Sequence, residues 1–441
     1  MNTNSKRIVC LNLQALPAYL PIVTQTVASS AGVFGLGKAD CLSLELAVEE
    51  IFQYLCNSAC PGNELKIECL DGIYYTQATF RFSASGMNLR GLNIAPSVTF
   101  NYEGECDLSE MGLLLASRSV DHLHVTIEKG NLVSLSVVKE KTYPRISDDL
   151  PLPETSGEIR LETPDPERLK QFCLLVGNHY SEQERPSFFD HPGKVVDMVA
   201  GGDYQCLVAM NPRKAVVGGI LYFSRTEKIV QCYGPYFFQT DQGTDTGAAL
   251  LDACLSRIAR GRALGLLSIS GLPHGLEANF EPLGDLNHYR DDVTPIKRSL
   301  FYRHLHEDPG GEAWSHAGLL EYLERAYERL VLARDIRIIR DMSETRAGYS
   351  LFAADVNRER SEVTLRPLLP GADFAANVES HIRFLSEERF RNLFFELDLG
   401  VPWHAELIPV IIARGFKPEI VLPFAGQSDL IVFQYHDAAQ S

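Results

Sequence analysis

The chain has 441 residues, of which 45% are hydrophobic and 22% are charged, and its formal net charge at pH 7 is −16. This acidity, without a local cluster of lysine and arginine, argues against a nucleic-acid partner, because neutralising phosphates requires a basic face. No apolar run approaches the about 20 residues that a membrane-spanning helix needs, so we expect no membrane insertion. The length exceeds that of one ordinary core and predicts two or three domains.

The N-terminus and the cysteines indicate a cytoplasmic protein. Lys6 and Arg7 precede an apolar stretch, but polar residues and two prolines interrupt it, which is not the pattern of a signal peptide. The ten cysteines are too sparse for a disulfide scaffold in a chain of this length. Cys56 and Cys60 lack a second pair at zinc spacing, so we expect buried free thiols and no metal site.

The first 142 residues, here called the N-terminal domain, combine helix and strand patterns. In the stretch SLELAVEEIFQYLCNSA, from Ser43 to Ala59, apolar side chains recur every three or four residues, which predicts an amphipathic helix with one buried face. A second helix is expected to begin at Met111 and to end near Asp121. The other expected elements are a helix, Leu16–Ala31, and four strands, Ser5–Val9, Leu65–Leu70, Gln77–Phe82 and Leu132–Lys139.

Residues 8 to 140 resemble the ATPase domain of anti-sigma-factor serine kinases, which has the Bergerat-type ATP-binding fold of histidine kinases, gyrase and Hsp90. In that family, a glutamate on the first motif helix handles the attacking water or hydroxyl, and an asparagine four residues later holds Mg²⁺. Glu50 matches the glutamate, whereas Tyr54 stands in the place of the asparagine. An alternative register pairs Glu49 with Gln53.

Two further motifs of that family are incomplete in this sequence. The resemblance places Gly86, in FSASG, in the loop that reads adenine, but the family's aspartate is missing there. It places Gly112, in EMGLLL, at the phosphate-binding helix start, where a glutamate replaces one glycine and would repel a triphosphate. We therefore expect a degenerate domain that neither binds ATP well nor acts as a kinase, with Glu50 as its remaining candidate catalytic residue.

A proline-rich and acidic segment, residues 143 to 157, lacks periodicity and is predicted to be a linker. Residues 158 to 310, here called the first lobe, then show the order strand, two helices, three strands, glycine-containing loop, helix and strand, with Asp165 as a helix cap. The expected elements are Ile159–Leu161, Pro166–Tyr180, Val195–Ala200, Tyr204–Met210, Val216–Phe223, Ile229–Phe237, a helix with its N-terminus near Gly247, and Leu266–Ser270.

The first lobe resembles the GNAT acyltransferases. The resemblance implies that the start of the helix after the fourth strand binds the pyrophosphate of acetyl-CoA, because free amides and the helix dipole favour anions there. The family motif Q/R-x-x-G-x-G/A is matched best by TDTGAA, in which threonine replaces the first residue and Asp245 is the expected N-cap. Tyr233 and Tyr289 stand where such enzymes often keep a base or a leaving-group acid. The implied cofactor-binding residues are Gly243, Thr244, Thr246, Gly247, Ala248 and Ala249.

Residues 311 to 441, here called the second lobe, repeat part of this pattern, although the anion-binding motif is reduced to PGAD at 370 to 373. We therefore predict tandem GNAT-like lobes, each partly eroded; the alternative is one enlarged acyltransferase with an elaborated C-terminal half. Glu396 and His404 are candidate polar site groups of the second lobe. The expected elements are a helix at His316–Leu332, strands at Ile336–Arg340, Ser350–Val356 and Glu362–Pro367, a helix at Asp373–Leu385, and strands at Asn392–Leu397, Ile420–Pro423 and Asp429–Tyr435.

These patterns predict an α+β multidomain protein, a Bergerat-type α/β sandwich followed by two GNAT-like mixed-sheet lobes. Our main hypothesis is a bacterial-type cytoplasmic regulatory protein with an acetyl-CoA-dependent N-acyltransferase module and an ATPase-like sensory or partner-binding domain. One alternative is an inactive, anti-sigma-like regulator that acts through a protein partner or a homodimer formed by the N-terminal domain. Another is an active ATP-binding serine kinase. A cleft between the fourth and fifth strands of the first lobe would favour the acyltransferase.

Overall fold

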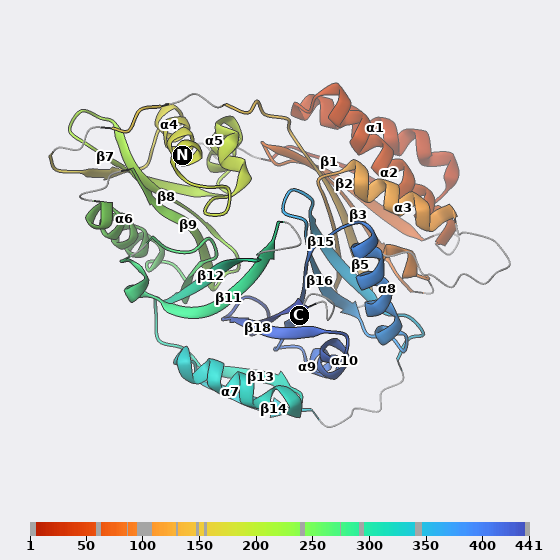
Figure 1. Ribbon diagram of the computed structural model, residues 1–441. Coiled ribbons are helices and arrows are strands. Elements are labelled where there is room, and N and C mark those ends of the chain that lie inside the picture. Colours follow the sequence, from red (N-terminus) through yellow and green to blue (C-terminus); the bar gives the residue numbers. More distant parts are fainter. Residues whose placement is uncertain are drawn as a thin grey trace.

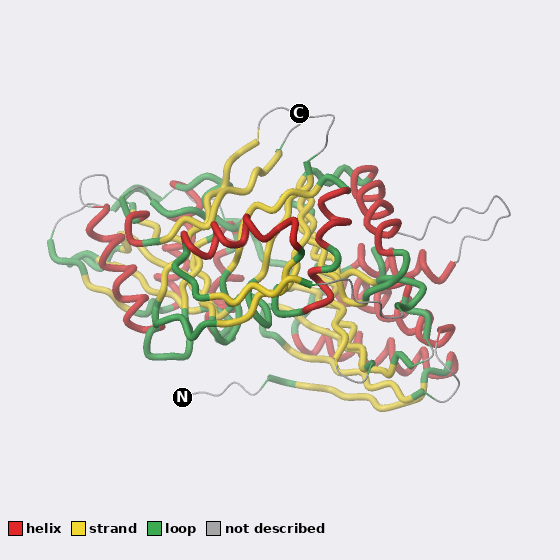
Figure 2. Tube along the Cα trace, turned by 90° about the horizontal axis from the view of Figure 1, so that it is seen from below, coloured by secondary structure: helices red, strands yellow, loops and turns green. Residues whose placement is uncertain are grey.

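The computed structural model describes residues 6–58, 63–85, 87–94, 108–128, 131–146, 150–153, 157–238, 243–273, 275–290, 295–339 and 346–436, with the backbone alone at 108–111 and 243–244. The described chain is a mixed α/β structure with three sheets of five or more strands and one two-stranded sheet. Figure 1 shows the N-terminal domain in red and orange, the first lobe in yellow and green, and the second lobe in cyan and blue. In the second view, strands run through the middle, helices lie at both ends, and one helix crosses in front of the strands (Figure 2).

The N-terminal domain is an antiparallel sheet in the order β1-β2-β3-β5-β4 with three helices on one face (Figure 1). The predicted apolar stripe of α2 is confirmed, because its members at the three-and-four spacing are all buried. The elements are β1 (Ile8–Gln14), α1 (Leu20–Phe34), α2 (Lys38–Ser58), β2 (Glu64–Asp71), β3 (Tyr75–Ser83), α3 (Leu108–Ser119), β4 (His122–Glu128) and β5 (Leu132–Glu140).

Several local predictions for this domain differ from the structure: the first strand is Ile8–Gln14 rather than Ser5–Val9, and the helix expected from Met111 begins at Leu108. The first helix begins at Leu20 rather than Leu16, because the preceding residues form a short 3-10 turn and Pro21 suits the first helical turn. That helix continues past Gly32 to Phe34 and is capped by Gly35, whose φ of 97° favours glycine. β4 was not predicted, although its sequence HLHVTIE alternates polar and apolar residues, with Leu123, Val125 and Ile127 at every second position.

The first lobe is a seven-stranded sheet in the order β11-β12-β10-β9-β8-β7-β6, in which only β9 and β10 are parallel. The hairpin of β11 and β12 was not predicted, because few of its residues are fully buried and its apolar pattern is weak. The elements are β6 (Arg160–Glu162), α4 (Pro166–His179), α5 (Pro192–Ala200), β7 (Gln205–Met210), β8 (Val216–Ser224), β9 (Ile229–Phe237), α6 (Gly243–Ile258), β10 (Gly265–Ser268), β11 (Glu281–Tyr289) and β12 (Pro295–His304).

Helices cover both faces of this sheet. Along β7, Cys206 and Val208 pack with α4 and α5, whereas Leu207 and Ala209 pack with α6. Successive strand residues face opposite sides, so a strand covered on both sides is apolar throughout. Asp165 accepts a hydrogen bond from the Arg168 amide, which confirms the predicted cap of α4.

The second lobe repeats the strand order of the first. Its sheet runs β15-β16-β17-β19-β18, with β16 and β17 parallel around helix α8, as β8-β9-β10-β12-β11 run around α6. A separate parallel pair, β13 and β14, is linked by α7. The elements are β13 (Gly311–Ser315), α7 (Leu320–Arg329), β14 (Arg334–Ile338), β15 (Leu351–Asn357), β16 (Glu362–Leu369), α8 (Phe374–Glu387), β17 (Asn392–Asp398), α9 (Pro402–Ala405), α10 (Ile408–Ala413), β18 (Phe416–Leu422) and β19 (Leu430–Tyr435).

Side-chain amides join the two lobes along β11. The buried Asn392 accepts a hydrogen bond from the Tyr289 amide at 2.8 Å and donates one to the Tyr289 carbonyl at 3.1 Å. The buried Gln434 makes the same pair of bonds with the backbone of Asn287. Each amide thus replaces the backbone of a neighbouring strand, which satisfies β11 without extending the sheet.

The second lobe also completes the core of the N-terminal domain. Leu351, which is fully buried, belongs to the apolar cluster formed by α1, α2 and the first sheet. The Tyr349 hydroxyl accepts a hydrogen bond from the Leu89 amide at 3.1 Å and donates one to the Met87 carbonyl at 3.3 Å. Asn93 bonds the backbone of Ser350 and of the following strand.

Candidate functional site

The sheet of the first lobe opens between β9 and β10. These strands pair in parallel only from Ile229 to Cys232 and from Gly265 to Ser268, and β9 continues to Phe237 without that partner. An extra residue in β9 opposite Gly219 and Leu221 forms a bulge, next to Gly234 with a φ of 87°. The cleft that the acyltransferase hypothesis requires is therefore present in the sheet.

Helix α6 begins directly beside this opening. Its first turn carries the TDTGAA stretch, and the leading amides of an α-helix have no acceptor within the helix. Thr246 is buried against the sheet, and a Cβ on Gly247 would stand 3.1 Å from the Phe237 ring and 3.0 Å from Leu276. The small residues therefore let the helix start approach the end of β9 closely.

The structure locates the other predicted cofactor-binding residues as follows. Gly243 and Thr244 form the first turn of α6, and Ala248 and Ala249 continue it half-buried. Asp245 lies inside this turn and is exposed, so the prediction that it caps the helix was wrong. An aspartate inside the first turn still interacts favourably with the helix dipole, although it lowers the attraction for phosphate.

A cavity of about 620 Å³ lies at the opening. The first lobe supplies the bulge of β9, the segment after β10, the β11–β12 hairpin and the segment between α4 and α5. The second lobe supplies Glu359, Arg360 and Ser361 from the turn between β15 and β16. The cavity is therefore completed by residues that lie far apart in the sequence.

The two tyrosines predicted as catalytic candidates do not lie together. Tyr289 lines this cavity. Tyr233 lines a second cavity of about 900 Å³, between the N-terminal domain and both lobes, and its hydroxyl accepts a hydrogen bond from Gln231 at 3.2 Å. Burial raises the Tyr233 pKa, so its phenol remains protonated near pH 7 and is suited to donate rather than to act as a base.

Sequence reasoning missed His288, the neighbour of Tyr289. Its Nδ1 lies 3.8 Å from a Glu362 carboxylate oxygen, and it lines the same cavity as Arg298 and Arg360. Burial, followed by the charges of the two arginines, lowers the His288 pKa to about 4, so the imidazole is neutral at pH 7. Because the β11–β12 hairpin was not predicted, no sequence pattern placed these residues together.

In the N-terminal domain, the structure brings together two residues of the ATPase resemblance. An oxygen of Glu50 occupies the space that a Cβ on Gly112 would take. Tyr54 is buried, and its hydroxyl donates a hydrogen bond to the Asn88 carbonyl at 2.9 Å. Gly86 lies outside the described residues. An aromatic ring therefore occupies the position that the resemblance assigns to a metal-binding asparagine, and the family assignment of this domain stays a prediction.

The second lobe has no equivalent anion site among its described residues, because its helix-start loop is already bonded. The Ala372 amide donates to the Ala347 carbonyl at 2.9 Å, and the Asp373 carboxylate accepts from the amide and hydroxyl of Ser350. Glu396 pairs with Arg366, and His404 accepts a hydrogen bond from the Asp398 amide. These groups therefore serve the structure of the lobe.

Two general features of the described residues concern metals and membranes. No group of three or more histidine, cysteine, aspartate or glutamate side chains in that part of the chain could hold a metal ion. None of its helices is both long and apolar enough to cross a bilayer.

The described cysteines are unpaired; Cys10 is exposed, which the prediction of buried thiols did not foresee.

No protein-family model matches the chain, and no curated protein sequence matches it. Among solved structures, it is similar to aminoglycoside 6'-acetyltransferase type Ii, with 12% identity, a TM-score of 0.29, and coverage of 34% of this chain and 99% of that one. A GNAT superfamily phosphinothricin acetyltransferase from Sinorhizobium meliloti, in complex with AcCoA, shares 17% identity over 34% of this chain and 89% of its own, with a TM-score of 0.27. A putative GNAT acetyltransferase from Desulfovibrio desulfuricans shares 14% identity over 34% of this chain and 100% of its own, with a TM-score of 0.29.

Proposed function

We propose that the first lobe is an acyl-CoA-dependent N-acyltransferase. The observation that carries this proposal is the opening between β9 and β10, with a bulged β9 on one side and the start of α6 beside it. An extended thioester-bearing arm fits between two diverging strands, where it can use the unpaired backbone groups of β9. The amides of the first turn of α6 suit the negative pyrophosphate at the other end of such a ligand.

Acetyl-CoA would supply the acyl group as a thioester. The acceptor amine forms a C–N bond to the acyl carbon while the C–S bond breaks, the amine proton passes to a base, and the released thiolate takes up a proton. The imidazole of His288 lines the cavity and is neutral at pH 7, so a ring nitrogen can orient the amine by accepting a hydrogen bond; its pKa of about 4 makes it a weak base, and the proton is passed on to water. Tyr289, on the same wall, is a candidate proton donor for the thiolate.

We also propose that the N-terminal domain is a regulatory module with decayed nucleotide chemistry, which contacts a partner or a second copy. Its support is that Tyr349 of the second lobe holds the backbone of the loop after β3, where the ATPase resemblance places adenine recognition. Tyr54 fills the metal-binding position. Full-length protein should show no thermal shift with ATP and Mg²⁺, and steady ATP hydrolysis would refute this part of the proposal.

The acyltransferase proposal is tested by titrating full-length protein with acetyl-CoA in a calorimeter and by following thiol release with a panel of amines. We expect saturable binding, a raised melting temperature, and thiol release that depends on the amine. His288→Gln should lower kcat while acetyl-CoA binding is kept; exposed His306→Gln is the matched control. Absence of acetyl-CoA binding at millimolar concentration would contradict the proposal.

A further inference from the structure

Two arginines, one from each lobe, line the wall of the 620 Å³ cavity and interact electrostatically. Arg298 of β12 donates from Nε to the carbonyl of Ile269, just after β10 ends, at 2.6 Å. Arg360, in the turn between β15 and β16, donates from a terminal nitrogen to the Arg185 carbonyl at 3.2 Å. Each guanidinium is thus anchored by one neutral acceptor, and neither forms an ion pair within the described part of the chain. We call Arg298 and Arg360 the arginine clamp.

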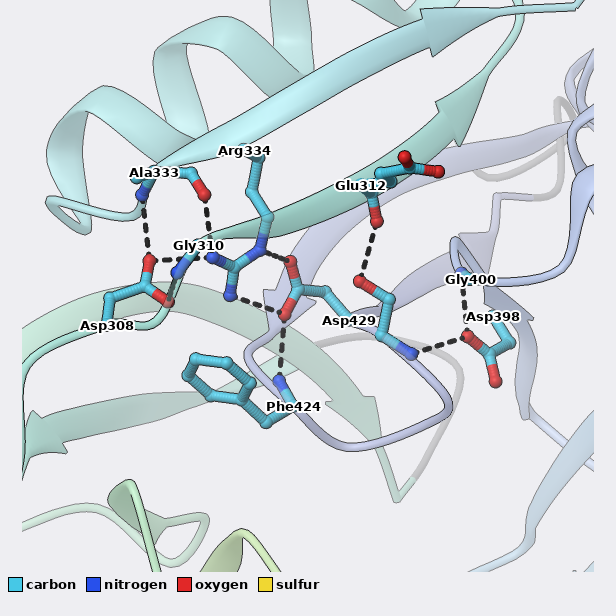
Figure 3. Close-up of polar contacts among 10 residues, drawn as sticks. Asp308, Gly310, Glu312, Ala333, Arg334, Asp398, Gly400, Phe424 and Asp429 are labelled. Carbon is cyan, nitrogen blue, oxygen red and sulfur yellow. Dashed lines mark hydrogen bonds and ion pairs between the residues drawn. The ribbon is translucent and has the colours of Figure 1, made fainter.

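Another buried arginine, Arg334, has ionic partners that the clamp arginines lack. Arg334, whose side chain is 1% exposed, lies between the carboxylates of Asp308 at 2.6 Å and Asp429 at 2.7 Å (Figure 3). These carboxylates raise the Arg334 pKa, although burial alone would lower it. At Arg298, burial and the charge of Arg360 together lower the pKa. The two arginines of the clamp therefore lack the paired carboxylates that offset the cost of burying the charge of Arg334.

The carboxylates around the clamp leave both of its arginines without a direct ionic partner. Glu362 interacts electrostatically with both arginines, and its pKa is raised by burial although both arginines oppose that rise. His288 is neutral at pH 7. On the cavity wall, Asp190 pairs with Arg185, Glu182 pairs with Arg290, and Glu184 accepts hydrogen bonds from Ser181. Glu277 and Glu359 also line the wall, and among the described residues neither forms an ion pair with the clamp. A bound anion would therefore give the two guanidinium groups the ionic partner that these carboxylates do not provide.

We infer that the arginine clamp binds the carboxylate of the acyl acceptor, so that the acceptor is an amino acid or another small molecule with a carboxylate near its amine. Guanidinium groups bind carboxylates through two parallel hydrogen bonds, which fixes orientation as well as affinity. Arg298 is anchored just beyond β10, so the bound carboxylate lies close to the opening where the amine must react. This inference rests on the proposed acyltransferase function.

The clamp is distinct from the site proposed for the CoA phosphates. Those phosphates are assigned to the start of α6, and no described residue of α6 lines this cavity. The second lobe thereby gains a role in acceptor choice, because Arg360 enters a cavity that the first lobe cannot close alone.

The test compares the common L-amino acids with their carboxamides, which keep the amine and remove the carboxylate charge. With full-length protein, calorimetry without acetyl-CoA should show binding of at least one amino acid and much weaker binding of its amide. Arg298→Gln and Arg360→Gln should each weaken amino-acid binding by about tenfold or more, with little change for the amide. Arg298→Lys keeps the charge and should recover part of the loss. Arg303→Gln, on the same strand but outside the cavity, should change neither ligand.

Acetyl-CoA binding is measured separately on each variant, which separates the two proposals. Acetyl-CoA binding with equal affinity for amino acids and amides would overturn the clamp and leave the acyltransferase proposal intact. Clamp-dependent amino-acid binding without acetyl-CoA binding would keep the clamp and refute the acyltransferase. Tighter binding of inorganic phosphate than of any amino acid would also refute the carboxylate assignment. If Arg298→Gln does not fold, Arg360→Gln and Arg298→Lys decide the outcome.

Discussion

At the scale of single residues, burial holds His381 and His404 neutral. The Nδ1 of His381 contacts the Asn377 carbonyl at 2.9 Å, and its other ring nitrogen is buried without a partner. The pKa of each histidine falls from 6.5 to about 4, mainly through burial. A proton that binds the unfolded chain but not the folded one destabilises the fold, so stability is full above pH 6.5 and is lost as the pH falls toward 4.

We predict that His381→Leu weakens this acid sensitivity. Wild-type stability should fall by at most about 1.4 kcal/mol per pH unit for each such histidine below pH 6.5, and the variant should lose one of these contributions. Melting temperatures of full-length protein from pH 7.5 to 4.5 measure the slope, with exposed His306→Gln as the control. An unchanged slope in His381→Leu would show that other groups govern acid unfolding.

Arg334 offers a second prediction at this scale. Arg334→Gln leaves Asp308 and Asp429 buried without their cation, and we expect a loss of about 3–5 kcal/mol, seen as a markedly lower melting temperature. Arg337 lies on the same strand, but its side chain is 45% exposed and its ion pairs are solvated. Arg337→Gln should therefore cost less than about 1 kcal/mol. Similar losses in the two variants would refute the structural role given to Arg334.

At the scale of elements, the approach of α6 to the sheet depends on Gly247. A methyl group there would stand 3.1 Å from the Phe237 ring, so Gly247→Ala should shift the first turn of α6 or cost about 1–3 kcal/mol. The predicted result is weaker acetyl-CoA binding by calorimetry, with a lower melting temperature. Gly32→Ala in α1 is the control, because a Cβ there meets nothing within 4 Å and alanine favours helix by about 1 kcal/mol. An unchanged affinity of Gly247→Ala for acetyl-CoA would show that the start of α6 does not take part in binding acetyl-CoA.

Element prediction from sequence succeeded where burial is one-sided or complete. The bounds of β9 were predicted without error, because every position from Ile229 to Phe237 is buried or half-buried and turn residues flank it. The same reasoning missed the β11–β12 hairpin, whose residues are largely half-exposed. The pairing of this hairpin is set by neighbouring strands, and its local pattern does not contain that information. β4 was also not predicted, although its residues alternate between polar and apolar.

At the scale of the whole molecule, the N-terminal domain and the second lobe share a core through Leu351. We predict that Leu351→Ala lowers the free energy of unfolding by about 2–5 kcal/mol. It should also lower the protection of backbone amides from hydrogen exchange in both parts, because the void left by the substitution lies at their junction. Hydrogen exchange of full-length protein measures this, with Val33→Ala, exposed on α1, as the control. Loss of protection in the second lobe alone would show that the two parts unfold separately.

The candidate site could be predicted only in part from the sequence, because it joins residues of two different lobes. The start of α6 and Tyr289 follow local patterns, and the TDTGAA stretch pointed to the first of them. The arginine clamp joins residues from different lobes, which no spacing reveals. Part of the repeat was anticipated from element order, namely two strands, a helix and a strand in each lobe, because buried strands and amphipathic helices keep their patterns when site residues change.

The position of Leu351 also has a consequence for biosynthesis. The first 142 residues emerge from the ribosome long before Leu351 is translated. Until then, the nascent N-terminal domain exposes an apolar gap, here called the socket, at the place where Leu351 later packs. At about 5–20 residues per second, this interval lasts on the order of ten seconds or more. A chaperone that shields the socket during translation would therefore raise the yield of native protein, and the domain matures only when the distal part of the chain arrives.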